Sequence, residues 1–246
     1  MAVNLNILQK VHKRLECNHS CLTGGLCFLC GSRLDISGPL LCSVCSLDLP
    51  LNNKACPVCA NPGEDGIICA ICLQSQKQQI KQTYCVYRYE YPISQLIQGM
   101  KFNSRLDIVA YFGRQLVNFA IQRNIRLPDC FIPVPLHPSR LRERGFNQSL
   151  ELARIVANET RVPVDYRICE RLLNTATQTG LPAHQRRRNI KGSFKINKNA
   201  LSRYQHVTII DDVVTTGSTV HELAYALNKI GIAQIDVWAC ARASIA

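Results

Sequence analysis

The sequence has no long apolar run, because charged or polar side chains interrupt every stretch before it reaches the roughly 18 residues that a membrane span needs. Residues 1–26 also lack the continuous apolar segment and the small-residue cleavage site of a signal peptide. We therefore expect no transmembrane helix and no secretion, and a protein that stays in the cytoplasm.

Acidic residues are few relative to basic ones. The 246 residues include 29 Lys and Arg but only 17 Asp and Glu, which gives a net charge of +12. Residues 27–72 hold two basic and four acidic residues, whereas residues 73–246 hold 24 basic and 12 acidic. This uneven distribution predicts a polyanionic partner for the C-terminal part. Solubility or generic nonspecific affinity is the alternative explanation.

Cysteine is abundant, with 14 residues. Disulfides are rare in the cytoplasm, so metal binding is the better explanation. Eight of the cysteines form four C-x-x-C pairs, and the other six are expected to pack as small apolar residues. The paired cysteines are Cys27 and Cys30, Cys42 and Cys45, Cys56 and Cys59, and Cys69 and Cys72. Two such pairs about a dozen residues apart can supply the four thiolates of a tetrahedral zinc site, so we expect two zinc ions.

The zinc sites are predicted to be structural. No histidine lies between Cys27 and Cys72, so no ligand position is obviously open for catalysis. Sequential pairing of the four C-x-x-C units is favoured because each half is then a complete ribbon, although cross-braced pairing fits the spacing too. Iron in a rubredoxin-like setting is the main rival to zinc. Because this segment is slightly acidic, packing or contacts with partner proteins are expected of it rather than electrostatic binding of nucleic acid.

The composition divides the chain into an N-terminal extension (1–26), a zinc-ribbon domain (27–72), a polar linker (73–79) and a larger domain (80–246). Strand and helix patterns alternate in the larger domain, which predicts an α/β fold with a mostly parallel sheet. Strands are expected at 83–89, 130–134, 207–210 and 234–241, and helices at 92–100, 106–122, 149–158 and 217–229.

One segment of the larger domain has the composition of a phosphate and sugar site. It reads V-T-I-I-D-D-V-V-T-T-G-S-T from Val207, so an apolar strand leads into Asp211 and Asp212 and then a loop at the start of a helix. The backbone N–H groups of such a loop and the helix dipole attract anions, and carboxylates at the carboxyl end of a strand can accept hydrogen bonds from ribose hydroxyls. A simple capped strand-turn-helix is the alternative. No lysine follows the glycine, which excludes a Walker A loop.

This segment resembles the signature of type I phosphoribosyltransferases. The resemblance implies that Asp211 and Asp212 hold the ribose diol of phosphoribosyl pyrophosphate and its Mg²⁺, and that they are the catalytic residues if ribose is transferred. It also implies that Thr215, Thr216, Gly217, Ser218 and Thr219 hold the 5-phosphate, and that Val214 before them belongs to the binding site for phosphoribosyl pyrophosphate. Thr215 stands where purine-salvage members often have an acid that acts as base, so an acceptor is not expected to be activated in that way.

Arginine is concentrated between residues 137 and 195, where 12 basic residues accompany five acidic ones. Arginine forks bind phosphate oxygens in a bidentate manner, so two groups are predicted to contact pyrophosphate or nucleic acid. The first group is Arg140, Arg142 and Arg144, and the second is Arg186, Arg187, Arg188 and Lys191. The alternative for each group is a solvated surface.

The stretches I-P-V-P-L-H-P-S-R-L-R-E-R-G-F-N-Q from Ile132 and Q-T-G-L-P-A-H-Q-R-R-R-N-I-K-G-S-F from Gln178 extend the resemblance. With the paired cysteines and the phosphoribosyl segment, they make the chain similar to the ComF family (ComFC- and GntX-like proteins) from Cys27 to near Arg242. That similarity implies a role in natural transformation, in which the protein handles incoming single-stranded DNA, with competence-machinery proteins as partners of the zinc domain. A metabolic phosphoribosyltransferase that acts on a small acceptor is the alternative.

Overall fold

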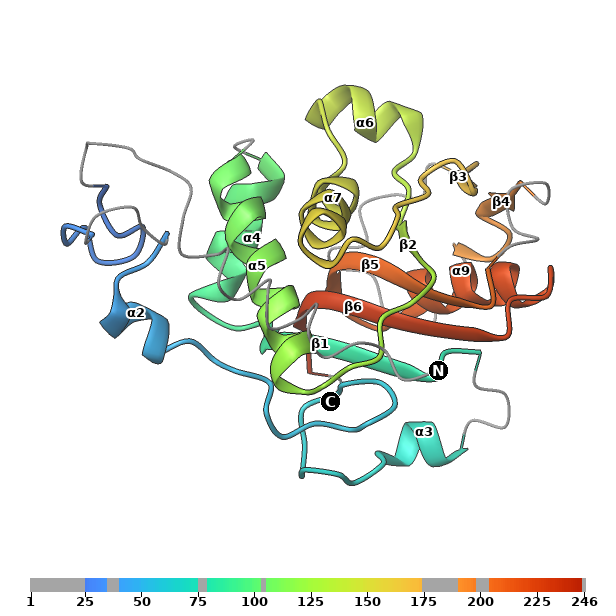
Figure 1. The fold of residues 1–246 in the computed structure, drawn as a ribbon, viewed down its shortest axis with the longest axis horizontal. Coiled ribbons are helices and arrows are strands. Elements are labelled where there is room, and N and C mark those ends of the chain that lie inside the picture. The colour runs from blue at the N-terminus through green and yellow to red at the C-terminus, as the bar shows by residue number, and fades with distance from the viewer. Residues whose placement is uncertain are drawn as a thin grey trace.

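A sheet of four parallel strands forms the centre of the computed structural model, which describes residues 25–34, 40–74, 79–102, 105–173, 190–197 and 204–244. The strands are β1 (Gln82–Arg88), β2 (Cys130–Pro133), β5 (His206–Val214) and β6 (Gln234–Arg242), in the order β1-β6-β5-β2. Every neighbouring pair is parallel. Figure 1 shows this sheet at the middle of the molecule, with helices on both sides. The α/β class with a mostly parallel sheet, which the sequence predicts, is therefore confirmed.

The inner strands are largely buried on both faces and consist mostly of apolar residues, as is typical of strands covered on both sides by helices. Every residue of β6 except its first is buried. The ring of Trp238 in β6 lies 5.4 Å from that of Phe131 in β2, between centroids, on the face that packs against the longer helices. This continuous burial explains why the strands were recognisable from the sequence.

Among the described residues, three helices cover one face of the sheet and one covers the other. The core around α4 (Ile93–Phe102), α5 (Leu106–Gln122) and α7 (Gln148–Thr160) contains Trp238 and Ile210, whereas α9 (Ser218–Asn228) packs with Val207, Ile209 and Val237. Helices α5 and α7 approach each other closely at Gly113, where a Cβ would lie 2.5 Å from the Ile155 Cγ2. Only glycine permits that approach. None of the helices in the described ranges has both the length and the apolar character needed to cross a membrane.

The sequence did not predict three short elements near the carboxyl ends of the strands. Helix α6 (Pro138–Arg144) follows β2, and β3 (Cys169–Arg171) pairs in antiparallel fashion with β4 (Phe194–Ile196). In Figure 1, α6 stands at the top above α7, with β3 and β4 to the right. They were missed because each is too short to show a clear apolar period.

The cysteine-rich segment, which includes α2 (Ser43–Leu47) and α3 (Ala70–Gln74), lies against the edge of the sheet. Residues 50–52 run beside β1: the Asn52 N–H donates to the Val86 carbonyl at 2.9 Å, and the Arg88 N–H donates to the Pro50 carbonyl at 2.8 Å. A bridge between Leu51 and Tyr87 lies between them. This contact covers an edge strand that would otherwise expose unpaired backbone groups.

Candidate functional site

Two carboxylates lie near the carboxyl end of β5, each bound by a different helix. Asp211 Oδ1 accepts a hydrogen bond from Ser149 Oγ in α7 at 3.1 Å and one from the Asp212 N–H at 2.9 Å. Asp212 Oδ2 lies 2.9 Å from Lys101 Nζ in α4. The sequence predicted that the strand ends at Ile210, before this pair, but β5 continues to Val214 because β6 pairs with it that far. Both carboxylates are therefore fixed by the sheet and do not belong to a loop.

Burial and neighbouring charges shift the pKa values of Asp211 and Lys101. Desolvation, followed by the charge of Asp212, raises the pKa of Asp211 to about 7, although the Asp212 N–H, Lys101 and Ser149 partly oppose the rise. Burial lowers the pKa of Lys101, but the charge of Asp212 and the hydrogen bond to it outweigh that effect and raise the pKa above its ordinary value. A divalent cation would relieve the repulsion between the two carboxylates, and their oxygen atoms are the hard ligands that Mg²⁺ prefers.

The hydroxyl loop, which we define as residues 215–219, leads from β5 into α9. Its turn places Gly217 at φ 76°, in the left-handed region that glycine adopts without strain. Thr216 Oγ1 and Ser218 Oγ lie 2.7 Å apart, and the Ser218 N–H donates to Thr216 Oγ1 at 3.4 Å. Hydroxyl and amide donors thus gather at the N-terminus of an 11-residue helix, where the helix dipole favours an anion.

Arg242, the last residue of β6, connects this loop to the rest of the structure. Its side chain is 2% exposed, and it donates only to backbone carbonyls in the contacts described. Nη1 donates to the carbonyls of Val214 at 3.0 Å and Ala243 at 2.7 Å, and to that of Thr215. Nε donates to the Cys59 carbonyl at 2.9 Å. Arginine in this position holds the end of β5 to the cysteine-rich segment.

The first predicted arginine group lies on α6, which follows the carboxyl end of β2. Arg142 is exposed, whereas Arg140 and Arg144 are partly buried. Burial lowers the pKa of Arg171 in β3, and the positive charge of Arg140 lowers it further, while Asp211 opposes the change. The charges of Arg140 and Asp211 therefore both act on Arg171. Phosphate oxygens bound there would offset the repulsion between the two arginines.

The second predicted arginine group is only partly described. Lys191 is exposed beside α9. Arg186, Arg187 and Arg188 lie outside the described residues. The position of those three arginines relative to the carboxylates is therefore not described.

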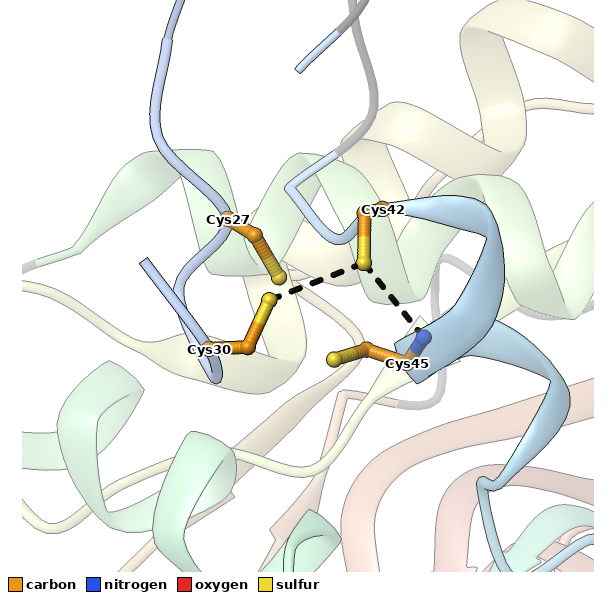
Figure 2. Close-up of side chains that lie close together, drawn as sticks. All are labelled: Cys27, Cys30, Cys42 and Cys45. Carbon is orange, nitrogen blue, oxygen red and sulfur yellow. Dashed lines mark hydrogen bonds between the residues drawn. The ribbon is translucent and has the colours of Figure 1, made fainter. Parts of the chain in front are cut away.

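The cysteines group sequentially, as the sequence analysis favoured. The first cysteine cluster is Cys27, Cys30, Cys42 and Cys45, and the second cysteine cluster is Cys56, Cys59, Cys69 and Cys72. All four sulfur atoms of each cluster lie within 4.8 Å of one another. Figure 2 shows the four side chains of the first cluster pointing toward a common centre. The cross-braced pairing left open by the spacing is not observed.

The sulfur distances fit a tetrahedral metal site. Sγ atoms lie 3.7 Å apart between Cys30 and Cys42, and 3.6 Å apart between Cys59 and Cys69. Zinc–sulfur bonds of about 2.3 Å place the sulfurs of a tetrahedral site about 3.8 Å apart, whereas a disulfide needs about 2.05 Å. Each cluster could therefore hold a zinc ion.

Backbone amides favour a thiolate in the first cluster. Burial raises the pKa of Cys27, but hydrogen bonds from the amides of Cys30, Cys42 and Leu29 outweigh it and lower the pKa to about 6. Hydrogen bonds with Cys30 and Cys42 raise the pKa of Cys45 to about 12. Sulfur atoms forced this close cannot all ionise together unless a cation binds among them.

A cavity of about 500 Å³ lies between the second cysteine cluster, the hydroxyl loop and α9. Its wall includes apolar side chains, among them Val58, Ile80 and Val220, and the polar residues Lys191 and His221. The size falls in the range of small-molecule sites. It opens on the same loop that the sequence assigns to a phosphate.

Four residues of this region were not found by sequence analysis: Lys101, Ser149, Arg171 and Arg242. Each lies far along the chain from Asp211, or on a different strand, and none belongs to a recognisable motif. Their roles depend on the order of the strands and the packing of α4 and α7, which no local pattern encodes.

Comparison with known proteins finds relatives that are named for competence or for DNA utilization. DNA utilization protein YhgH of Salmonella typhi is 36% identical over 223 residues, which cover 89% of this chain and 97% of that protein. Competence protein F of Haemophilus influenzae is 34% identical over 228 residues, with 88% and 96% covered. Competence protein ComFC of Bacillus subtilis is 24% identical over 226 residues, with 84% and 90% covered. No family model matches the chain.

Proposed function

The chain belongs to the ComF family of competence proteins, and from this premise we propose that it handles single-stranded DNA entering the cytoplasm and binds phosphoribosyl pyrophosphate with Mg²⁺. The relatives named for competence and for DNA utilization support a role in DNA uptake. The chemistry of β5, the hydroxyl loop and α6 supports the ligand.

One observation carries the small-ligand proposal: the buried pair Asp211 and Asp212 leads directly into a loop of hydroxyl and amide donors at the start of α9. In this proposal the carboxylates accept hydrogen bonds from the ribose hydroxyls and hold Mg²⁺, which neutralises their repulsion. Residues Thr215 to Thr219 bind the 5-phosphate. Arg140 and Arg171 bind the pyrophosphate, because they are arginines whose charges act on each other or on Asp211 near the carboxyl ends of β2 and β5.

The DNA proposal depends on charge. Residues 73–246 hold 24 basic and 12 acidic residues, whereas the cysteine-rich segment is slightly acidic. Phosphate neutralisation by lysine and arginine drives single-strand binding and makes it sensitive to salt. We assign the contacts to Arg140, Arg142, Arg144, Arg186, Arg187, Arg188 and Lys191.

We further propose that each cysteine cluster binds one structural zinc ion. The ligands are all thiolates, no water position is needed for catalysis, and the sulfur spacing suits zinc. The domain that the two ions stabilise is the proposed contact for other proteins of the DNA-uptake machinery.

A phosphoribosyltransferase acting on a small acceptor is the second candidate. The observation that favours it is the cavity of about 500 Å³ beside the hydroxyl loop, which has the volume for a small molecule near the phosphate. In that case the carboxylates would act in ribose transfer and the basic surface would be incidental.

The experiment that separates the two candidates is fluorescence anisotropy of the full chain with labelled single-stranded DNA of mixed sequence. We expect binding at low salt that weakens steeply as salt increases and shows little preference for sequence. Saturating phosphoribosyl pyrophosphate with Mg²⁺ should weaken it further if both ligands use the same arginines. No binding at low salt would contradict the DNA proposal and favour the small-acceptor enzyme.

A further inference from the structure

Arg242 is a buried cation surrounded by backbone oxygen atoms. Its acceptors are the carbonyls of Val214, Thr215 and Ala243 on one side and that of Cys59 on the other. Among the described residues it forms no ion pair. The free energy of burying this guanidinium is therefore offset by these carbonyls. Nη1 shares three of them, whereas the Cys59 carbonyl is the acceptor described for Nε, so its loss leaves a buried donor without that partner.

These contacts fix the position of the peptide groups at which the hydroxyl loop begins. Val214 ends β5, and Thr215 is the first residue of the loop. A guanidinium is planar and rigid, so it fixes the relative positions of the oxygen atoms that it binds. The Val214 carbonyl also accepts the Ala243 N–H at 3.0 Å, so the start of the loop is fixed to the residues that follow β6.

The Cys59 carbonyl belongs to a turn of the second cysteine cluster. In this turn the Ala60 N–H donates to the Cys56 carbonyl and the Cys56 N–H donates to the Asn61 carbonyl, both at 2.9 Å. Ala60 has a φ of 55°, an unusual conformation for a residue with a side chain. Turns of this kind fold when their cysteines bind metal, so the position of the Cys59 carbonyl depends on the ion.

The first cysteine cluster serves as an internal control for the second, because it contacts a different part of the structure. It packs against the side of α5, where the Arg105 guanidinium lies 4.9 Å from the centre of the Phe28 ring. In the parts of the chain that the structure describes, no hydrogen bond joins this cluster to residues 214–219. The two clusters thus have similar ligands but different neighbours.

We propose that Arg242 is a positioning residue through which metal binding at the second cysteine cluster orders the hydroxyl loop. Loss of the ion there releases the Cys59 carbonyl, removes one acceptor from Arg242 and loosens the loop. The first cluster has no such effect. The inference deepens the proposed function, and it rests on that function for the ligand but not for the order of the loop.

The test compares Cys69→Ser with Cys42→Ser in the full chain. Both residues are the third cysteine of their clusters and both are partly buried, so the two variants are matched. Hydrogen–deuterium exchange of peptides covering residues 213–221 reports the order of the loop without any ligand. We expect Cys69→Ser to speed exchange there by at least about tenfold and Cys42→Ser to change it by less than about twofold.

Arg242→Lys tests the connection itself. A lysine ammonium is a compact charge that cannot span the four carbonyls, so this variant should keep both metal ions and still show the fast loop exchange of Cys69→Ser. If Cys69→Ser does not fold, Arg242→Lys carries the test alone. Where both fold, the double variant should exchange no faster than either single one, because the two changes break the same connection.

Binding of phosphoribosyl pyrophosphate with Mg²⁺ is measured on the same proteins. An affinity at least about tenfold weaker in Cys69→Ser and Arg242→Lys, but not in Cys42→Ser, is the expected result. Unchanged loop exchange in Arg242→Lys, or equal changes in the two cysteine variants, would overturn the inference even if the ligand binds. If the loop responds as expected but no protein binds the ligand, the inference holds and the proposed function is wrong.

Discussion

Lys101 Nζ lies 2.9 Å from Asp212 Oδ2, in an ion pair that joins the end of α4 to the strand carrying both carboxylates. The two side chains are 22% and 12% exposed, so water screens the pair only in part. Lys101 therefore supplies a positive charge beside the two adjacent carboxylates.

Replacing Lys101 should therefore expose the repulsion between the carboxylates. We expect Lys101→Met to lower the free energy of unfolding by about 2 kcal/mol in urea titrations, because it leaves a largely buried carboxylate unpaired. Millimolar Mg²⁺ should restore part of the loss, and should stabilise this variant more than the unmodified protein.

The matched control is Arg154→Met. Arg154 pairs with Glu151 at 2.7 Å, but its side chain is 55% exposed, so its removal should cost less than about 1 kcal/mol. Equal losses for the two variants, or no response of Lys101→Met to Mg²⁺, would contradict the role given to Lys101.

The raised pKa of Asp211 predicts how stability depends on pH. The folded protein keeps this carboxyl protonated up to about pH 7, whereas the unfolded chain releases the proton near the ordinary value of 3.8. Unfolding between these values releases a proton, so the contribution of Asp211 to stability falls as pH rises through this window and is constant above it.

The measurement compares urea unfolding of the unmodified protein and Asp211→Asn, without Mg²⁺. From pH 5.5 to 7, the unmodified protein should lose on the order of 2 kcal/mol relative to the variant, and the difference should then level off. A relative stability that stays constant over the same range would show that Asp211 ionises in the folded protein at its ordinary pKa or below.

Metal content tests the assignment of the cysteine clusters. Elemental analysis of protein prepared without added metal should find about two zinc ions per chain, since each cluster supplies four thiolates. Cys42→Ser should retain about one, and Cys42→Ser with Cys69→Ser about none. Predominant iron, or a single zinc ion in the unmodified protein, would be inconsistent with two separate zinc sites.

Charge reversal on α6 tests the nucleic-acid surface. Arg142 is exposed on the helix that follows the carboxyl end of β2, so Arg142→Glu should weaken single-strand binding and lower the slope of log affinity against log salt by about 0.7 or more. The control is Arg126→Glu, which makes the same charge change in the connection before β2, at the opposite end of that strand. If the two variants behave alike, binding follows the total charge and has no particular location.

The sequence predicted the elements that have strong local signals. The helix expected at residues 106–122 was observed with those bounds, because its apolar residues recur with helical spacing on a buried face. The carboxylate pair and the hydroxyl loop were recognisable because a strand, two acids, a glycine turn and a helix follow one another in the chain.

The rest of the site arises from distant parts of the chain. Ser149 reaches Asp211 from 62 positions away, and Arg242 reaches Cys59 from 183 away. No feature of the sequence around Arg242 distinguishes it from an exposed arginine, because its burial follows from the position of β6 between β1 and β5. The bounds of β5 were also too short in the sequence analysis, since the side chains that bind its two acidic residues, Ser149 and Lys101, come from helices distant in the sequence.

The central claim is that Asp211, Asp212 and the hydroxyl loop bind phosphoribosyl pyrophosphate with Mg²⁺. Isothermal titration calorimetry with the full chain tests it most directly, using the unmodified protein and Asp211→Ala with Asp212→Ala, after unfolding curves have shown that both are folded. The account predicts saturable, Mg²⁺-dependent binding to the unmodified protein and none to the double variant. Equal affinity for both proteins, or no binding to the unmodified one, would contradict it.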